Sequence, residues 1–315
     1  MTTTVISPAT AIDKVWPPLP YAAWGDTCTT LQLWMQIVGK IRMELVPHIN
    51  HSWNVTLYPT IRGVSTFPMA YGRGMLQIDF DFVDHALRIE SSESGRRTIV
   101  LAQMSVAAFY RAVMDALDEL HTPVTIWPWP MEVADPIRLD QDEVHRAYDA
   151  EYANRFWRVL LQTTRLFTAF RARFGGKVSP VHLFWGAMDL ACTRFCGREA
   201  PEHPSMPGLP DRVTRDAYSH EVSSAGSGPA ERGWTRCSTA THIPSRRDIA
   251  NIASRPPRLH SAMTSASSSC PTKRCARQPT PTPRCWSSCR RHTRPRRVAA
   301  RGIVRHSRWT RNLLK

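Results

Sequence analysis

The stretch VHLFWGAMDLACTRF, residues 181–195, combines a histidine, an acid and an arginine with three aromatic side chains. If the stretch is helical, His182, Trp185 and Asp189 share one face, because they recur at steps of three and four. A histidine and a carboxylate so placed could polarise a water molecule, hold a metal ion or bind a ligand, and Arg194 could add a contact to an anion. The competing role, and the commoner one, is a polar pair that satisfies its own hydrogen bonds inside the core.

A second candidate lies in SHEV, residues 219–222, where His220 precedes Glu221. Neighbouring residues of a strand face opposite ways, so we expect only one of the two to join His182 in a common site. Convergence of His182, Asp189 and His220 would favour an enzyme. Scattering of the three would favour a binding module.

Weaker candidates precede these. His48 and His51 stand three apart in PHINHSWN, but the sequence offers no clear third ligand for a metal ion. Arg62 could bind an acid or simply occupy an edge strand. Asp79 and Asp81 could act as paired carboxylates, but they alternate with apolar residues, so we expect them on a solvated strand face.

The cysteines do not predict a metal site. Cys192 and Cys196 are four apart, but such cysteines are more often core residues than half of a metal site. Further cysteines near the C-terminus have irregular spacings that do not match zinc fingers or ribbons. No phosphate-binding glycine loop, zinc-protease motif or serine-hydrolase motif is present, and the cofactor is left unknown.

The elements that would position these residues alternate between helix and strand. The sequence predicts an α+β fold with a mostly antiparallel sheet, an N-terminal helix, a mid-chain helix, a long helix and a disordered tail. Four helices are predicted. The first begins at a cap on Asp26 or Thr27 and ends at Pro47, the second is capped by Ser105, and the third covers about 142–174. The fourth runs from Pro180 to about Cys196, although its VHLFW segment is also compatible with a strand. The predicted strands cover 53–63, 75–83, 87–90, 98–102 and 124–127.

The net charge of +15 belongs to one part of the chain. Residues 226–315 hold 20 of the 41 Lys and Arg residues and two of the 26 acids, a net charge of +18. Residues 1–225 hold the remaining 21 basic and 24 acidic residues, a net charge of −3. The basic character therefore gives no support for nucleic-acid binding by the first 225 residues, and a nucleic-acid role through the tail ranks last.

Apolar periodicity also stops near residue 226, and Ser, Arg, Pro, Thr and Cys dominate from there. A disordered basic tail explains the low complexity, but such tails are seldom rich in both Trp and Cys. Shifting the codon frame by one base can restore an apolar pattern, because the TCN codons of Ser and the codons of Cys and Trp place T in the middle of the shifted codon, and a middle T encodes an apolar residue. We therefore predict a leader at 1–13, a single domain at 14–225 and an out-of-frame tail at 226–315.

The same sequence gives expectations about location and partners. The N-terminus lacks a basic segment followed by an apolar run, and no window is apolar enough for a membrane span. We expect a soluble cytoplasmic protein with reduced thiols, no membrane partner, and an unknown small molecule or protein as the partner.

Five blocks of the chain resemble an uncharacterised bacterial family, domain of unknown function 5996, from about Trp16 to Gly226. The blocks are WPPLPYAAWGDTCTTLQLWMQIVGKIRMEL, YPTIRGVSTFPMAYG, IDFDFVDHALRI, GKVSPVHLFWGAMDLACTRFCGR and AYSHEVSSAG. The resemblance implies no activity and no catalytic set. Two hypotheses follow from the residues: a small-ligand binding or interaction module, and a hydrolytic or metal-assisted enzyme that uses a His/Asp pocket.

Overall fold

The alternation of apolar and polar residues around Phe80 builds the central strand of the first sheet. The computed structural model describes residues 15–202, 211–229 and 241–242. In it, Leu76, Ile78 and Phe80 point into the core from one face of their strand. The six strands of this sheet are β1 (Tyr58–Pro59), β2 (Gly63–Ser65), β3 (Met69–Tyr71), β4 (Gly74–Asp81), β5 (Ala86–Ser91) and β6 (Gly95–Val100). Their order is β1-β2-β4-β5-β6, with β3 also paired to β4, and every pairing is antiparallel.

The second sheet is where the sequence prediction was wrong. The segment predicted as a helix from Pro180 to Cys196 instead forms the hairpin of β7 (His182–Phe184) and β8 (Asp189–Glu199). The same sheet contains β9 (His220–Ser227) and β10 (Thr241–His242), in the antiparallel order β10-β9-β8-β7. β9 continues two residues past the predicted domain boundary at Ala225, and β10 lies beyond it.

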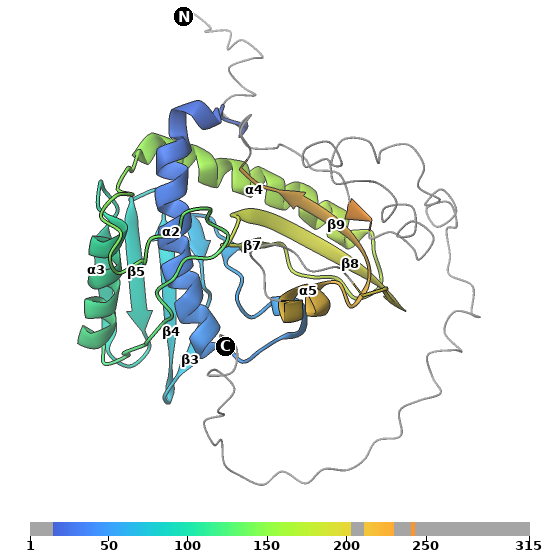
Figure 1. Ribbon diagram of the computed structural model, residues 1–315, viewed down its shortest axis with the longest axis horizontal. Helices are drawn as coiled ribbons and strands as arrows, with labels where there is room; N and C mark the ends of the chain where they lie inside the picture. The colour runs from blue at the N-terminus through green and yellow to red at the C-terminus, as the bar shows by residue number, and fades with distance from the viewer. Residues whose placement is uncertain (1–14, 203–210, 230–240, 243–315) are drawn as a thin grey trace, which may run out of the picture. The chain divides into compact units, whose positions relative to one another are not determined.

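Helices α2 (Tyr21–Leu45), α3 (Val106–Glu119) and α4 (Ala150–Ala172) pack around the sheets, and a short helix, α5 (Asp211–Ala217), precedes β9. Figure 1 shows α2 crossing the first sheet and α4 running along β8 and β9. Ser105 caps α3 as predicted, because its side chain accepts a hydrogen bond from Ala108 N. The α+β class and the antiparallel sheet are confirmed.

Three boundaries differ from the prediction for local reasons. α2 begins at Tyr21, after Pro20, so Asp26 lies inside the helix. The long helix begins only at residue 150, because the Asp142 carboxylate binds the backbone N–H groups of residues 144 and 145 and so favours a turn. Residues 53–57 and 124–127 belong to no strand; a short 3-10 turn (Asn50–Ser52) precedes β1 instead.

One core joins the helices and both sheets. The Trp34 ring stacks on Phe109 and Tyr148, with ring centroids 4.6 and 5.6 Å apart. Leu183, on β7, exchanges two backbone hydrogen bonds with Leu57, next to β1. The two sheets are therefore connected through backbone as well as through side chains. No helix within the described residues is long and apolar enough to cross a membrane.

The end of β4 corrects the expectation that both of its acids face water. Asp81 is only 1% exposed, and its carboxylate accepts hydrogen bonds from Arg62 Nε at 2.5 Å and from Arg88 Nη1. The backbone N–H groups of residues 83 and 84 also donate to it. Burial alone would raise the pKa of Asp81, but these hydrogen bonds hold it well below its usual value. Asp79 is half-buried and accepts a hydrogen bond from Gln77.

Candidate functional site

The β7–β8 hairpin places His182 and Asp189 on the same face of the second sheet. His182 pairs with Ala191, and Phe184 pairs with Asp189, so all four side chains lie on that face. His182 and Asp189 are diagonal neighbours, which are roughly 7–8 Å apart across an antiparallel pair. The sequence prediction was correct that the two residues share a face, and wrong that a helix brings them there.

The two faces of this sheet differ in character. Leu183, Leu190 and Cys192 point into the main core that α4 covers. The opposite face, which we call the polar face, is only partly buried. It carries His182, Phe184, Asp189, Ala191, Thr193, Phe195, Val222 and Ser224. Trp53 and Tyr218 pack against Phe195 and Val222 on this face.

A carboxyl pair lies at the β7 end of the polar face. Burial and, to a smaller extent, the charge of Glu132 together raise the pKa of Asp189 to about 6. Partial desolvation of its carboxyl also raises the pKa of Glu132, although the residue as a whole is exposed. Within the described residues, neither carboxyl forms an ion pair with a Lys or Arg side chain. Tyr218 is close enough that its pKa, raised first by burial, is raised again by Asp189. Asp189 is therefore a poorly solvated carboxyl, whereas Glu132 is exposed to water.

The sequence analysis missed Glu132, which a polar stripe on α2 positions. Gln36 donates a hydrogen bond from Nε2 to Met131 O at 2.8 Å and accepts one from Met131 N at 2.7 Å. Gln32, one turn earlier, donates from Nε2 to Gly186 O at 2.5 Å. Glu132 thus lies over Gly186, where a Cβ atom would overlap its carboxylate, and it has a left-handed backbone with φ of 56°. The sequence signal that could have indicated this position is a pair of glutamines four apart on an otherwise apolar stretch of helix.

The next polar residue of the stripe is Lys40, which the sequence analysis also missed. Its ammonium lies 5.7 Å from the centroid of the Trp185 ring and has no hydrogen-bond partner within the described residues. Burial lowers the pKa of Lys40 to about 8, although the charge of Glu44 opposes the shift. The Trp185 ring itself lies against Gly39, where a Cβ would overlap it, and its Nε1 donates to Val55 O at 2.7 Å. Trp185 is therefore a packing residue rather than a lining residue of the polar face.

His182 is buried among aromatic rings. It is 1% exposed, and its ring centroid lies 4.8 Å from that of Phe184, 6.3 Å from Tyr58 and 6.4 Å from Trp53. Its Nδ1 has no hydrogen-bond partner within the described residues. Burial lowers the pKa of His182 to about 3, so the imidazole is neutral at physiological pH.

His220 does not join His182 but lies with the weaker candidates His48 and His51. The rings of His51 and His220 are 6.4 Å apart, and His48 Nε2 lies 3.6 Å from Asp216 Oδ2. His51 is fixed to α5 by two bonds to Asp216: its backbone N–H donates to the carboxylate at 2.6 Å, and its Nδ1 lies 2.8 Å from the backbone carbonyl. The Trp53 ring stands between this histidine group and His182.

Three other candidates have partners away from the carboxyl pair. Arg194 points to the opposite face, where its guanidinium lies 3.5 Å from the centroid of the Phe170 ring. Glu221 accepts hydrogen bonds from Arg198 at 2.8 and 2.5 Å, so its charge is neutralised. Arg62 binds Asp81 in the first sheet. The structure therefore separates these three residues from His182 and Asp189.

The cysteines of the domain lie apart from the polar face. Cys28 and Cys192 are buried, Cys196 is exposed, and all three are free thiols. The expectation that both are core residues is met by Cys192 and is wrong for Cys196, which is exposed at a position of β8 beyond the core. No group of three His, Cys, Asp or Glu side chains in the described part of the chain is arranged to hold a metal ion. The cysteines from Cys237 onward lie outside the described residues.

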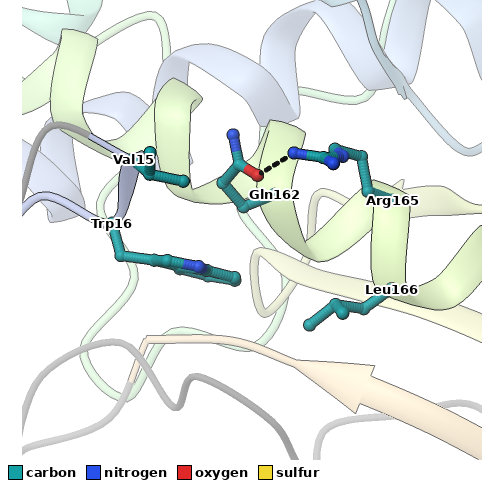
Figure 2. A pocket seen from close by; sticks show the side chains of 5 residues that line it. All are labelled: Val15, Trp16, Gln162, Arg165 and Leu166. Carbon is teal, nitrogen blue, oxygen red and sulfur yellow. Dashed lines mark hydrogen bonds between the residues drawn. The ribbon is translucent and has the colours of Figure 1, made fainter. Parts of the chain in front are cut away.

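A surface pocket of about 350 Å³ lies elsewhere, on α4 (Figure 2). Its lining residues are Val15, Trp16, Gln162, Arg165 and Leu166. Arg165 donates to the Gln162 side chain at 2.9 Å, and none of the lining residues is a candidate from the sequence. This pocket offers an apolar surface and one cation, but no acid–base pair.

The fold defines an α+β protein with two antiparallel sheets and one polar face. The chain belongs to the family of unknown function DUF5996, whose model matches residues 16–258. The match begins where the resemblance was expected to begin and continues beyond Gly226. No curated protein and no solved structure matches the chain.

Proposed function

We propose that the chain is a small-ligand-binding module and that its ligand binds on the polar face through an amino group or a similar hydrogen-bond donor. The observation that carries this proposal is the Asp189–Glu132 pair, in which a half-buried carboxyl lies beside an exposed one and neither has a basic partner among the described residues. Keeping such charges away from water is costly unless a cation or several donors compensate them. A ligand amine would supply that compensation.

The surroundings of the pair suit an organic ligand rather than a bare ion. Phe184 is half-buried beside Asp189, and the neutral imidazole of His182 follows on the same face. Small-molecule sites typically combine apolar and aromatic walls with a few polar groups that fix orientation. The ligand class we infer is therefore a small amine with an apolar portion.

An acid–base enzyme is the second candidate, and it has one observation in its favour. The pKa of Asp189, raised to about 6, is close to the value at which a carboxyl exchanges protons efficiently near neutral pH. A hydrolytic role would use Asp189 as the base that activates water. His220 would take no part, because it lies with His51 beyond Trp53.

The test is calorimetric titration of the full chain with a panel of small amines, matched with alcohols and carboxylic acids of the same shape. We expect amines alone to bind, and Asp189→Asn and Glu132→Gln to weaken that binding at least tenfold. Glu90→Gln, which removes an exposed carboxylate from β5, serves as the control. Amine binding of undiminished affinity after both substitutions would refute the proposal. Hydrolysis of simple esters that is lost in Asp189→Asn would favour the enzyme instead.

We also infer that the chain enters a shifted reading frame beyond about residue 225, although the family match in the present frame continues to residue 258. The support is compositional, since residues 230–240 and 243–315 lie outside the described part of the chain. Sequencing the gene from the codon of Ser219 to the stop tests this inference. A base inserted or missing there restores the apolar frame, whereas an intact frame would show that the basic segment is genuine.

A further inference from the structure

Beside the histidine group, the ammonium of Lys177 lies in a cage of rings. Its Nζ is 4.9 Å from the centroid of the Phe195 ring and 5.3 Å from that of Trp53. The third wall is His51, whose Nε2 lies 2.8 Å from the same Nζ. Within the described residues, no carboxylate forms an ion pair with this ammonium. We call Trp53, His51 and Phe195 the ring cage.

The walls of the cage are fixed by other parts of the fold. Phe195 is 4% exposed on β8, and His51 is 6% exposed. The carbonyl of Asp216 accepts from His51 Nδ1, so that nitrogen carries the ring proton and Nε2 has a free lone pair. Burial lowers the pKa of His51, and so does the nearby Lys177, which keeps this neutral form. Nε2 therefore accepts a hydrogen bond from the ammonium.

Outside the cage, by contrast, the occupant is held only by its backbone. Lys177 is exposed, and its carbonyl accepts a hydrogen bond from Phe195 N at 2.9 Å, which places the residue beside β8. The four-carbon side chain is flexible, and its ammonium is well hydrated when it points to solvent. Hence the cage is preformed, and the side chain that fills it can leave without a change in the fold.

We propose that the ring cage is a binding site for a small ammonium ligand and that Lys177 is its tethered competitor. Aromatic faces attract ammonium groups through the ring quadrupole, and this is how proteins recognise methylated amines. The lone pair of His51 Nε2 adds a requirement, because the ligand must keep one N–H to donate. The class is therefore a primary, secondary or tertiary ammonium rather than a quaternary one.

A tethered competitor lowers the affinity for an external ligand by the fraction of time for which the cage is free. Because the lysine stem is short, its ammonium is present at an effective concentration on the order of millimolar or above. Removal of the ammonium should therefore expose the intrinsic affinity of the cage. The proposal rests on contacts separate from the Asp189–Glu132 pair, so the two sites can be tested independently.

The experiment titrates trimethylammonium into the full chain and into Lys177→Met, which keeps the length of the stem and removes the charge. We expect Lys177→Met to bind trimethylammonium at least tenfold more tightly than the parent chain. Tetramethylammonium, which has no N–H, should bind more weakly, and the neutral tert-butanol should not bind. Arg173→Met removes an exposed cation nearby and should leave binding unchanged.

Three results would overturn the proposal: equal affinity in the parent chain and Lys177→Met, a preference for the quaternary ion, or binding that survives Trp53→Leu in the Lys177→Met background. Lys177→Gln replaces Lys177→Met if the latter does not fold. Adding Asp189→Asn to Lys177→Met separates the two sites. If that change abolishes binding while Trp53→Leu does not, the ligand sits at the carboxyl pair and the cage proposal fails alone.

Discussion

Asp81 in the first sheet and Asp189 in the second are both desolvated, but their surroundings act on their charges in opposite ways. Two arginines and two backbone N–H groups surround the Asp81 carboxylate, and its pKa is lowered. Asp189 has Glu132 as its charged neighbour, and its pKa is raised to about 6. The first arrangement stabilises a charge within the fold. The second leaves the charge without an oppositely charged partner among the described residues.

This difference separates a structural acid from a candidate functional one. Buried acids with complete partners are part of the packing, whereas raised pKa values cluster at sites that bind or react. The candidates Arg62 and Glu221 belong with Asp81 in this respect, because each has an oppositely charged partner. Burial alone would not have distinguished the two groups.

The largest effect on stability should come from removing the charge of Asp81, which two arginines neutralise. Asp81→Asn leaves Arg62 and Arg88 without their buried partner, so we expect a loss of about 3–5 kcal/mol in the free energy of unfolding at pH 7. Because the folded pKa is lowered, the contribution of Asp81 is complete above the ordinary Asp pKa of 3.8 and is lost as the pH falls below it. Denaturant unfolding at pH 7 and at pH 3 measures this difference.

Asp84 provides the control for that prediction. It binds the same two arginines, but its side chain is 53% exposed. Exposed ion pairs contribute less than about 1 kcal/mol, so Asp84→Asn should cost far less than Asp81→Asn. Equal losses from the two substitutions would show that burial of Asp81 is not the cause.

Removing the charge of Asp189 should raise the free energy of unfolding, whereas removing the charge of Asp81 should lower it. Its folded pKa of about 6 exceeds the ordinary value of 3.8, so its ionisation weakens the fold progressively as the pH rises through 6. Asp189→Asn should therefore stabilise the ligand-free chain by about 1–3 kcal/mol at pH 7.5, at about 1.4 kcal/mol per pKa unit. The gain should vanish at pH 3. Stabilisation that is equal at both pH values would contradict this account.

The smallest expected effect is on the pKa of Asp189, and it separates the contribution of Glu132 to that pKa from the contribution of burial. In Gly186→Ala, the new Cβ would occupy the place of the Glu132 carboxylate, which would have to move away. We expect the pKa of Asp189 to fall toward its ordinary value, though only in part, because burial is the larger cause. Carbon-13 NMR titration of the Asp189 carboxyl measures the shift. Gly175→Ala, where a Cβ would contact nothing, is the control.

The sequence predicted the elements whose periodicity has one interpretation. Leu76, Ile78 and Phe80 allow only a strand, and Ser105 is an unambiguous helix cap. The hairpin at 182–199 was misassigned because its apolar residues fit both periods, and because the positive φ of its turn falls on Met188 and not on Gly186. Local pattern does not distinguish these alternatives when the deciding contact, between residues 57 and 183, is distant in sequence.

The sequence likewise predicted only part of the candidate site. His182 and Asp189 were identified because both residue types are chemically distinctive within an apolar stretch. Glu132 was missed because it lies in a loop whose position depends on Gln36, far away in the chain. Lys177 was missed because a single lysine in a loop carries no pattern, and only the fold brings Trp53 and Phe195 to it.

The backbone pairing of Leu57 with Leu183 has a consequence for how the chain folds. It joins two sheets whose other strands pair mostly with near neighbours in sequence, so its formation closes a very long loop. Contacts of this kind slow folding, because the entropy of loop closure is lost before the contact stabilises anything. We expect the first sheet to gain hydrogen-exchange protection early during refolding. The polar face should form only in the last, slowest phase.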